Sequence, residues 1–174
     1  FRFEPPQGFA SLCTANMKDA DYAPIGPNSA AGTPDKHFDT LLYTGDAKEK
    51  RVGGLNFQPD FVWIKSRSTT HSHALYDSLR GTNSRLYSDA TSTEQITDTQ
   101  MDSFTSDGFS IGTHVHLNTD DHNYVAWCWK AGNDSVVDNS GTIGVTRSTN
   151  VDAGFSIIRY AKNDTAGATI AHGL

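Results

Sequence analysis

The histidines are the residues whose types and spacing could do chemistry in this chain. Two pairs have the spacing His-X-His: His71 with His73, and His114 with His116. If each pair lies on a β-strand, both imidazoles point to the same side of the sheet. Neighbouring imidazoles can bind a transition metal ion, and in a trimer three such pairs can meet on the axis. The spacing places no cysteine or carboxylate beside them, so exposed polar residues at a strand edge are the alternative interpretation.

Carboxylates offer a second kind of chemistry, because glycoside hydrolysis needs two carboxyl groups across one bond. The Asp107-Gly108 dipeptide is, however, typical of a turn, and residues 119–123, TDDHN, are typical of a polar hairpin loop. That loop also lacks the alternating acids and the glycine of a dedicated calcium site. The sequence contains no phosphate-binding loop, nucleophile elbow or zinc-protease motif. These features favour a protein that is not an enzyme and needs no cofactor. The carboxylates closest to aromatic or strand-forming segments are Asp77, Asp107, Asp120 and Asp121.

Aromatic and basic side chains offer a third possibility, contact with a glycan. Tyr76, Arg80 and Tyr87 are flanked by polar residues and are candidates to contact a host glycan or receptor. Other aromatic residues could stack on sugar rings, but most lie in strands that look buried on both faces, so core packing explains them better. These are Trp63, Tyr124, Trp127 and Trp129. The basic residues Lys65, Arg67, Arg80 and Arg85 flank the loops around His71 and could bind an anionic glycan or form an ordinary solvated rim.

Short strands must position these side chains, since about ten segments have strand-like apolar patterns separated by Gly, Asn and Asp. NYVAWCWK and DFVWIK are apolar on both faces, which predicts central strands covered on both sides. One short helix is expected at residues 93–101, TEQITDTQM, capped by Thr93 or Ser92. The fold class is therefore all-β, an antiparallel β-sandwich or jelly-roll-like fold with at most one short helix. The expected strands lie in HFDTLLYT, AKEKRVGG, PDFVWIKS, HALYDSLR, SRLYS, SDGFSIGTHVHL, NYVAWCWKA, TIGVTRS, GFSIIRYA and ATIAHGL.

An internal repeat organises the chain. Residues 38–55, FDTLLYTGDAKEKRVGGL, and residues 155–174, FSIIRYAKNDTAGATIAHGL, align from Phe38 with Phe155 to Leu55 with Leu174. The first copy continues into NFQPDFVWIKSRS and the second meets the end of the sequence, so we expect the natural polypeptide to continue. We expect residues 1–37 to be a leading segment and linker that leaves an upstream β domain. Residues 38–132 would form the main β domain, and residues 133–174 a linker and the start of a second, truncated repeat or closing strands.

Composition excludes some partners. The 174 residues include 14 basic and 20 acidic side chains, and the net charge of -6 repels phosphate backbones, so nucleic acid is not an expected partner. No apolar run reaches the roughly 20 residues of a membrane span, so membrane insertion is not expected either. Cys13 and Cys128 lack the spacing of a zinc site or a disulfide framework. We expect Cys128 and Trp127 to be almost inaccessible.

Several segments together resemble a known family. HFDTLLYTG, GLNFQPDFVWIKSRS, HALYDSLRG, SFTSDGFSIG and YVAWCWKAG are similar to a domain of unknown function in virion proteins of tailed bacteriophages, notably marine ones. There it occurs in long tail-fibre, tail-appendage or head-fibre chains, often after a SPRY-like, concanavalin-A-like β-sandwich. The resemblance covers residues 38–132 closely and the chain from Gly154 in outline, and FRFEPPQGFASLCTAN is similar to the exit of the SPRY-like neighbour.

The resemblance implies a non-enzymatic structural module of the virion, in a tail fibre or appendage involved in host attachment. The protein would be made in the host cytoplasm and act in the extracellular phage particle. Expected partners are further copies of the chain, as a homo-trimer, other virion proteins, and a host surface glycan or receptor. The alternatives are a carbohydrate-binding, lectin-like module, a polysaccharide depolymerase, and a capsid fibre or decoration protein.

Overall fold

The computed structural model describes residues 34–98 and 100–174, and Asp35–Leu174 form one compact unit. Nearly all of its regular structure is β, as the sequence predicts. In chain order the described elements are the 3-10 helix η2 (Pro34–Lys36), β1 (Phe38–Thr44), β2 (Lys50–Gly53), β3 (Phe61–Ser66), β4 (Ala74–Asp77), β5 (Gly81–Leu86), β6 (Gln95–Ile96), β7 (Met101–Thr105), β8 (Gly108–Ile111), α1 (Val115–Asn118), β9 (Asn123–Trp129), β10 (Val136–Asp138), β11 (Val145–Asn150) and β12 (Phe155–Tyr160).

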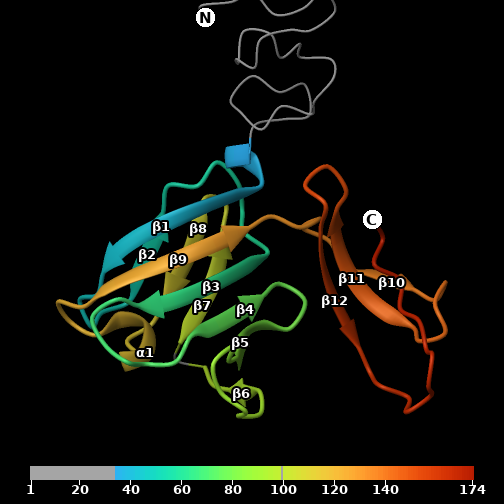
Figure 1. Cartoon of the computed structure of the whole chain (residues 1–174). Coiled ribbons are helices and arrows are strands. Elements are labelled where there is room, and N and C mark those ends of the chain that lie inside the picture. The colour runs from blue at the N-terminus through green and yellow to red at the C-terminus, as the bar shows by residue number, and fades with distance from the viewer. Residues whose placement is uncertain (1–33, 99) are drawn as a thin grey trace, which may run out of the picture. The chain divides into compact units, whose positions relative to one another are not determined.

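The strands form three antiparallel sheets. The largest has the order β1-β9-β3-β4-β5-β6, and the other two have the orders β2-β8-β7 and β10-β11-β12. Figure 1 shows β2, β8 and β7 lying behind the large sheet, as the second layer of a sandwich. Gly108 allows β8 to lie against β2, because a Cβ atom at this position would be 2.0 Å from the carbonyl oxygen of Val52. The expected turn at Asp107-Gly108 thus starts β8.

The core fills the space between these two layers. Strand alternation explains it, because Val62 and Ile64 of β3 point inward while Phe61, Trp63 and Lys65 point the other way. The buried apolar cluster takes residues from both sheets and from α1: Tyr43, Val52, Leu55, Phe57, Val62, Ile64, Ala74, Tyr76, Met101, Phe109, Ile111, Leu117, Tyr124, Ala126 and Cys128. The antiparallel sheets and the single short α-helix confirm the predicted fold class, and their layering is consistent with a β-sandwich.

Strand β9 differs from its prediction on one face. It lies between β1 and β3, as a central strand should, and Cys128 is fully buried, as expected. Trp127, by contrast, is only half-buried, and so are Val125 and Trp129 on the same face. The expectation that both faces are covered was wrong, because the second layer packs against only one face of the large sheet.

The short helix forms at a different place from the predicted one. Residues 93–101 contain β6 and the first residue of β7 instead, with Ile96 paired to Ser84 and Gln95 to Arg85. Strand pairing overrides the weak helix propensity of this Thr- and Asp-rich segment. The helix α1 lies in HVHL, where a strand was expected. Three strands, β6, β7 and β10, were not predicted, and in ATIAHGL only an isolated parallel bridge between Ile143 and Ile170 is found.

The two copies of the repeat form edge strands of different sheets but share local features. The first copy forms β1 at the edge of the large sheet, and the second forms β12. The glycine of each Gly-Leu pair has positive φ, +121° at Gly54 and +77° at Gly173. The first phenylalanine of each copy contacts Trp129, with ring centroids 4.8 Å apart for Phe38 and 6.2 Å for Phe155. The repeat therefore reproduces a strand and a glycine conformation.

The division at residues 132 and 133 stays a prediction, although the β10-β11-β12 sheet lies entirely after it. Interpretations of residues 1–33, including the leading segment and Cys13, fall outside the described residues. Within the described part of the chain, no helix has the length and apolar character to cross a membrane.

Candidate functional site

The four predicted histidines lie in loops and a helix, not on strands. His71 and His73 precede β4 in the loop that follows β3. His114 is the N-cap of α1, where its Nδ1 accepts the backbone N–H of His116 at 3.2 Å. The expectation of two strand-borne pairs was wrong, because a side chain that caps a helix competes with strand geometry for the backbone.

Three of the four imidazoles nevertheless come together. The ring centroids of His71 and His116 are 4.6 Å apart, and those of His114 and His116 are 5.0 Å apart. His73 is engaged elsewhere, since its Nδ1 accepts a hydrogen bond from Trp63 Nε1 at 2.7 Å. The fold therefore joins one histidine from the β3–β4 loop with two from α1 and its cap.

Arg85 of β5 lies beside these three imidazoles and is hydrogen-bonded to His116. Its side chain is 1% exposed, and Nη1 donates to Nδ1 of His116 at 2.8 Å. Nη2 donates to the Tyr87 hydroxyl and to Gln95 Oε1, and the guanidinium lies 4.5 Å from the centre of the Tyr87 ring. We call His71, His114, His116 and Arg85 the His–Arg cluster. Sequence reasoning left open whether Arg85 binds an anionic glycan or belongs to a solvated rim, and the alternation of SRLY gave no signal that it would be buried.

The hydrogen bonds fix where the imidazoles carry their protons. A guanidinium and a backbone N–H can only donate. Nδ1 of His116 and Nδ1 of His114 are therefore both acceptors, and each neutral ring carries its proton on Nε2. In this state both rings offer an N–H donor to the surroundings, and neither offers a free lone pair.

Both rings are also hard to protonate. Burial, followed by the charges of Arg85 and His71, lowers the pKa of His114. The same causes, with His114 added, lower the pKa of His116 to about 4. The groups that act on these two imidazoles come from β5, the β3–β4 loop and α1, and all of them are basic.

This chemistry bears on the predicted metal site. Among residues 34–98 and 100–174, no group of three or more His, Cys, Asp or Glu side chains could hold a metal ion. A metal ion needs the ring lone pairs, and at His114 and His116 these accept hydrogen bonds instead. A metal at His71, His73, His114 and His116 stays an untested prediction that would require these hydrogen bonds to break.

The three residues predicted to contact a glycan differ in how accessible they are. Tyr76 cannot touch a glycan, because its ring is fully buried and its hydroxyl bonds Gln100 in the core. Arg80 is half-buried and pairs with Asp77 and with Glu94. Tyr87 is partly exposed beside Arg85. Of the three residues, only Tyr87 is both partly exposed and in contact with the His–Arg cluster.

The outer face of the large sheet carries the tryptophans. Trp63 lies opposite Trp127 in the β3–β9 register, with ring centroids 5.8 Å apart. Trp129 lies opposite Phe61, and Phe155 of β12 contacts both rings. These residues are half-buried, whereas Tyr124 points into the core. We call Trp63, Trp127 and Trp129 the tryptophan face, which the sequence interpretation wrongly placed in the core.

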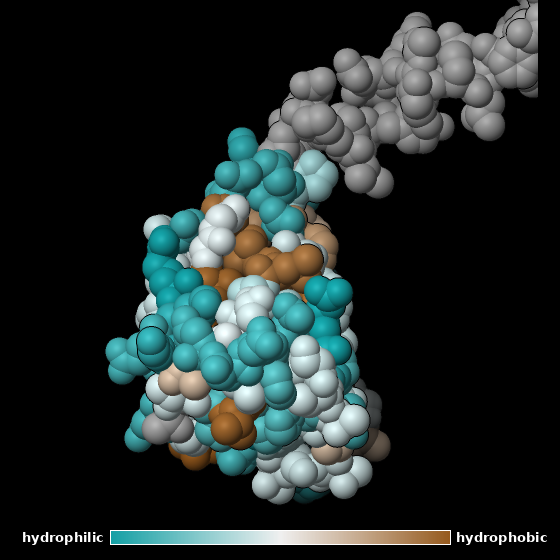
Figure 2. Space-filling model, turned by 90° about the vertical axis from the view of Figure 1, so that its left-hand side faces the viewer, coloured by the Kyte–Doolittle hydropathy of each residue, from teal (hydrophilic) through white to brown (hydrophobic). Residues whose placement is uncertain are grey.

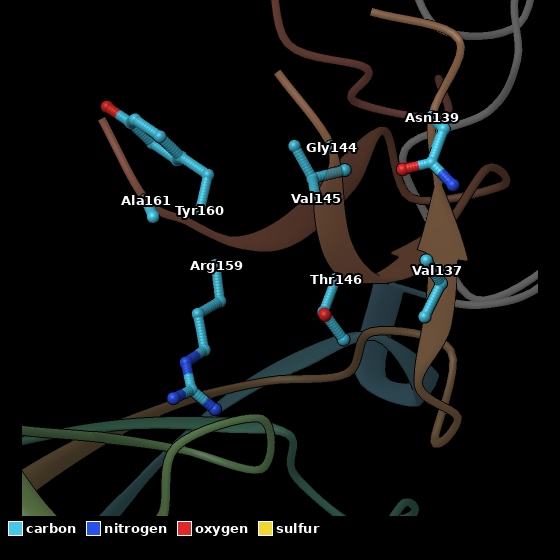
Figure 3. Close-up of a pocket in the computed structure, with 8 residues that line it drawn as sticks. All are labelled: Val137, Asn139, Gly144, Val145, Thr146, Arg159, Tyr160 and Ala161. Carbon is cyan, nitrogen blue, oxygen red and sulfur yellow. The ribbon is translucent and has the colours of Figure 1, made fainter. Parts of the chain in front are cut away.

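Two of the four predicted carboxylates, Asp77 and Asp107, have structural roles, whereas Asp120 and Asp121 lie in the turn between α1 and β9. Asp77 is nearly buried and its Oδ1 accepts the backbone N–H groups of Leu79 and Arg80, which ends β4 in a turn. Asp107 lies in the turn between β7 and β8 and pairs with Arg51 of β2, the strand next to β8. Asp121 has φ of +57° in the loop before β9. A hollow of about 470 Å³ lies on the β10-β11-β12 sheet and is lined by Val137, Asn139, Gly144, Val145, Thr146, Arg159, Tyr160 and Ala161. Figure 3 shows Arg159 and Tyr160 pointing to opposite sides of β12, and the lining residues include no carboxylate or histidine.

The fold is that of an antiparallel β module consistent with a β-sandwich, and its described residues include the His–Arg cluster and the tryptophan face. The chain belongs to a family described as a domain of unknown function (DUF7483), which it matches over residues 33–174. No curated protein and no solved structure matches the chain. The family membership agrees with the resemblance to a domain of unknown function.

Proposed function

We propose that this chain is a non-enzymatic structural module of a tailed-bacteriophage virion, in a tail fibre or related appendage that takes part in host attachment. The observation that carries the proposal is the repeated strand motif, which forms an edge strand of one sheet as β1 and of another as β12. Reuse of one β unit along a chain is typical of long modular proteins. The resemblance to phage virion proteins supports the same function.

Self-association fits this role. The β10-β11-β12 sheet has two edge strands, and unpaired edges favour pairing with another chain. Apolar side chains are exposed on this sheet and the segment after it, namely Val136, Val137, Val151, Tyr160, Ile170 and Leu174. On the face shown in Figure 2, apolar residues also gather in one patch with hydrophilic residues around it. We expect a homo-trimer, the cyclic arrangement common in virion appendages.

The experiment is to locate the protein on particles. Antibodies raised against residues 34–174 would be applied to purified virions of the virus that encodes the chain and detected by gold labelling in the electron microscope. Label at the tail or its fibres is expected. Label on the head would favour a capsid fibre or decoration protein. The proposal would be refuted if the particles carry no label and mass spectrometry of them detects no peptide of this chain.

A lectin-like function is the second candidate, and the tryptophan face favours it. Half-exposed indole rings on a sheet can stack on sugar rings. Trp127→Ala should abolish binding to any glycan found by array screening, whereas Leu42→Ala, an exposed position on β1 of the same sheet, should not. Equal binding by the two variants would remove the tryptophan face from glycan recognition.

A further inference from the structure

We propose that the His–Arg cluster binds an oxyanion, such as a sulfate, phosphate or carboxylate group, through the Nε2–H donors of His114 and His116. The buried guanidinium of Arg85 would supply the opposite charge. This inference does not depend on the function proposed above.

The first argument is the charge of Arg85. Among the described residues, no carboxylate lies within ion-pair distance of this guanidinium, although it is 1% exposed. Its recorded partners, His116, Tyr87 and Gln95, are neutral groups, and its Nε has no partner in the part of the chain that the structure describes. Burying a charge without a counter-charge is costly, and a bound anion would remove that cost.

The second argument is the direction of the hydrogen bonds. His114 and His116 use Nδ1 to accept bonds from groups that can only donate. The Nε2–H groups that remain suit an anion and do not suit a metal ion, which needs lone pairs. Both rings are partly exposed, so a ligand can reach them.

The third argument is the sign of the local field. The groups that lower the pKa of His114 and His116 are Arg85, His71 and the neighbouring imidazole itself, from β5, the β3–β4 loop and α1. The carboxylate that contacts the β3–β4 loop is Asp89, which follows β5. Its Oδ1 accepts the backbone N–H of His73 at 3.2 Å and not an N–H of the His–Arg cluster. The cluster thus forms a local basic site on a chain whose net charge is -6.

The test is a titration of the purified chain with sodium sulfate at constant ionic strength, at about pH 6, followed by histidine-selective ¹⁵N NMR. A saturable shift of the His114 and His116 Nε2 signals is expected, and sulfate should raise the pKa of His116. The key variant is His116→Asn, since Asn Oδ1 can still accept from Arg85 but lacks the Nε2–H donor. It should bind sulfate roughly tenfold or more weakly. His172→Gln, an exposed histidine outside the cluster, should bind like the wild type.

Two further measurements separate the alternatives. Tighter binding of a sulfated polysaccharide than of free sulfate, lost on desulfation, would identify the oxyanion as a glycan substituent, and equal binding would identify a free ion. The proposal is refuted if sulfate causes no saturable shift of the Nε2 signals in the wild type, or if His116→Asn binds sulfate as well as the wild type. It is also refuted if zinc ions alone shift these signals and a chelator reverses the shift.

Discussion

The low pKa of His116 predicts how the stability of the fold depends on pH. In the unfolded chain this imidazole titrates near 6.5, and in the folded chain near 4. Between these values the unfolded state binds the extra proton, so the stabilising contribution is complete above pH 6.5 and is lost as pH falls toward 4. The difference of about 2.5 pH units corresponds to at most about 3.4 kcal/mol. Because the ring is partly exposed, solvent screening reduces this to about 1–2 kcal/mol.

The assay is urea denaturation of the wild type and of His116→Asn at a series of pH values from about 7.5 to about 4.5. The wild type should lose about 1–2 kcal/mol more of its free energy of unfolding than the variant, because the asparagine keeps the Arg85 contact but does not titrate. His172→Gln controls for loss of an ordinary exposed histidine and should follow the wild type. Identical pH dependence of the wild type and His116→Asn, or a His116 signal that titrates near 6.5 in the folded protein, would refute the reasoning.

Three other predictions follow from burial and from the proposed assembly. Burial raises the pKa of the Cys128 thiol to about 12, so a thiol reagent should not label it in the native protein, and rapid native labelling would contradict the buried position. Leu55→Ala should cost about 2–5 kcal/mol in the free energy of unfolding, because Leu55 is 4% exposed. The matched change at the repeat partner, Leu174→Ala, should cost under about 0.5 kcal/mol, since Leu174 is 50% exposed; equal costs would mean that the two positions are packed alike. Light scattering should show a trimer across about pH 5–8, with or without chelator. A monomer in every condition would remove self-association from the proposal, and dissociation by chelator would restore the metal interpretation of the histidines.

Local sequence determined most of the strands and the class of the fold. Side chains two residues apart in a strand share a face, so the apolar residues on both faces of DFVWIK and NYVAWCWK predicted β3 and β9 and their central place in a sheet. The Asp107-Gly108 turn and the positive φ of Gly54 and Gly173 also follow from residue type, because glycine adopts this conformation without strain. HFDTLLYT and GFSIIRYA, which begin the two copies of the repeat, are both predicted as strands, and β1 and β12 confirm that each is one.

Tertiary structure decided what covers each face and which distant segments meet. The alternation of side chains places Trp63 and Trp127 on the same face as the residues two positions away in their strands. That this face is half-exposed follows only from the position of the second layer, which covers the other face. Arg85 and His116 are 31 residues apart in the chain, and no local pattern indicates that strand β5 buries the guanidinium below the cap of α1. A pattern of side chains specifies the conformation of a segment, whereas burial and charge depend on packing between segments that the pattern does not relate.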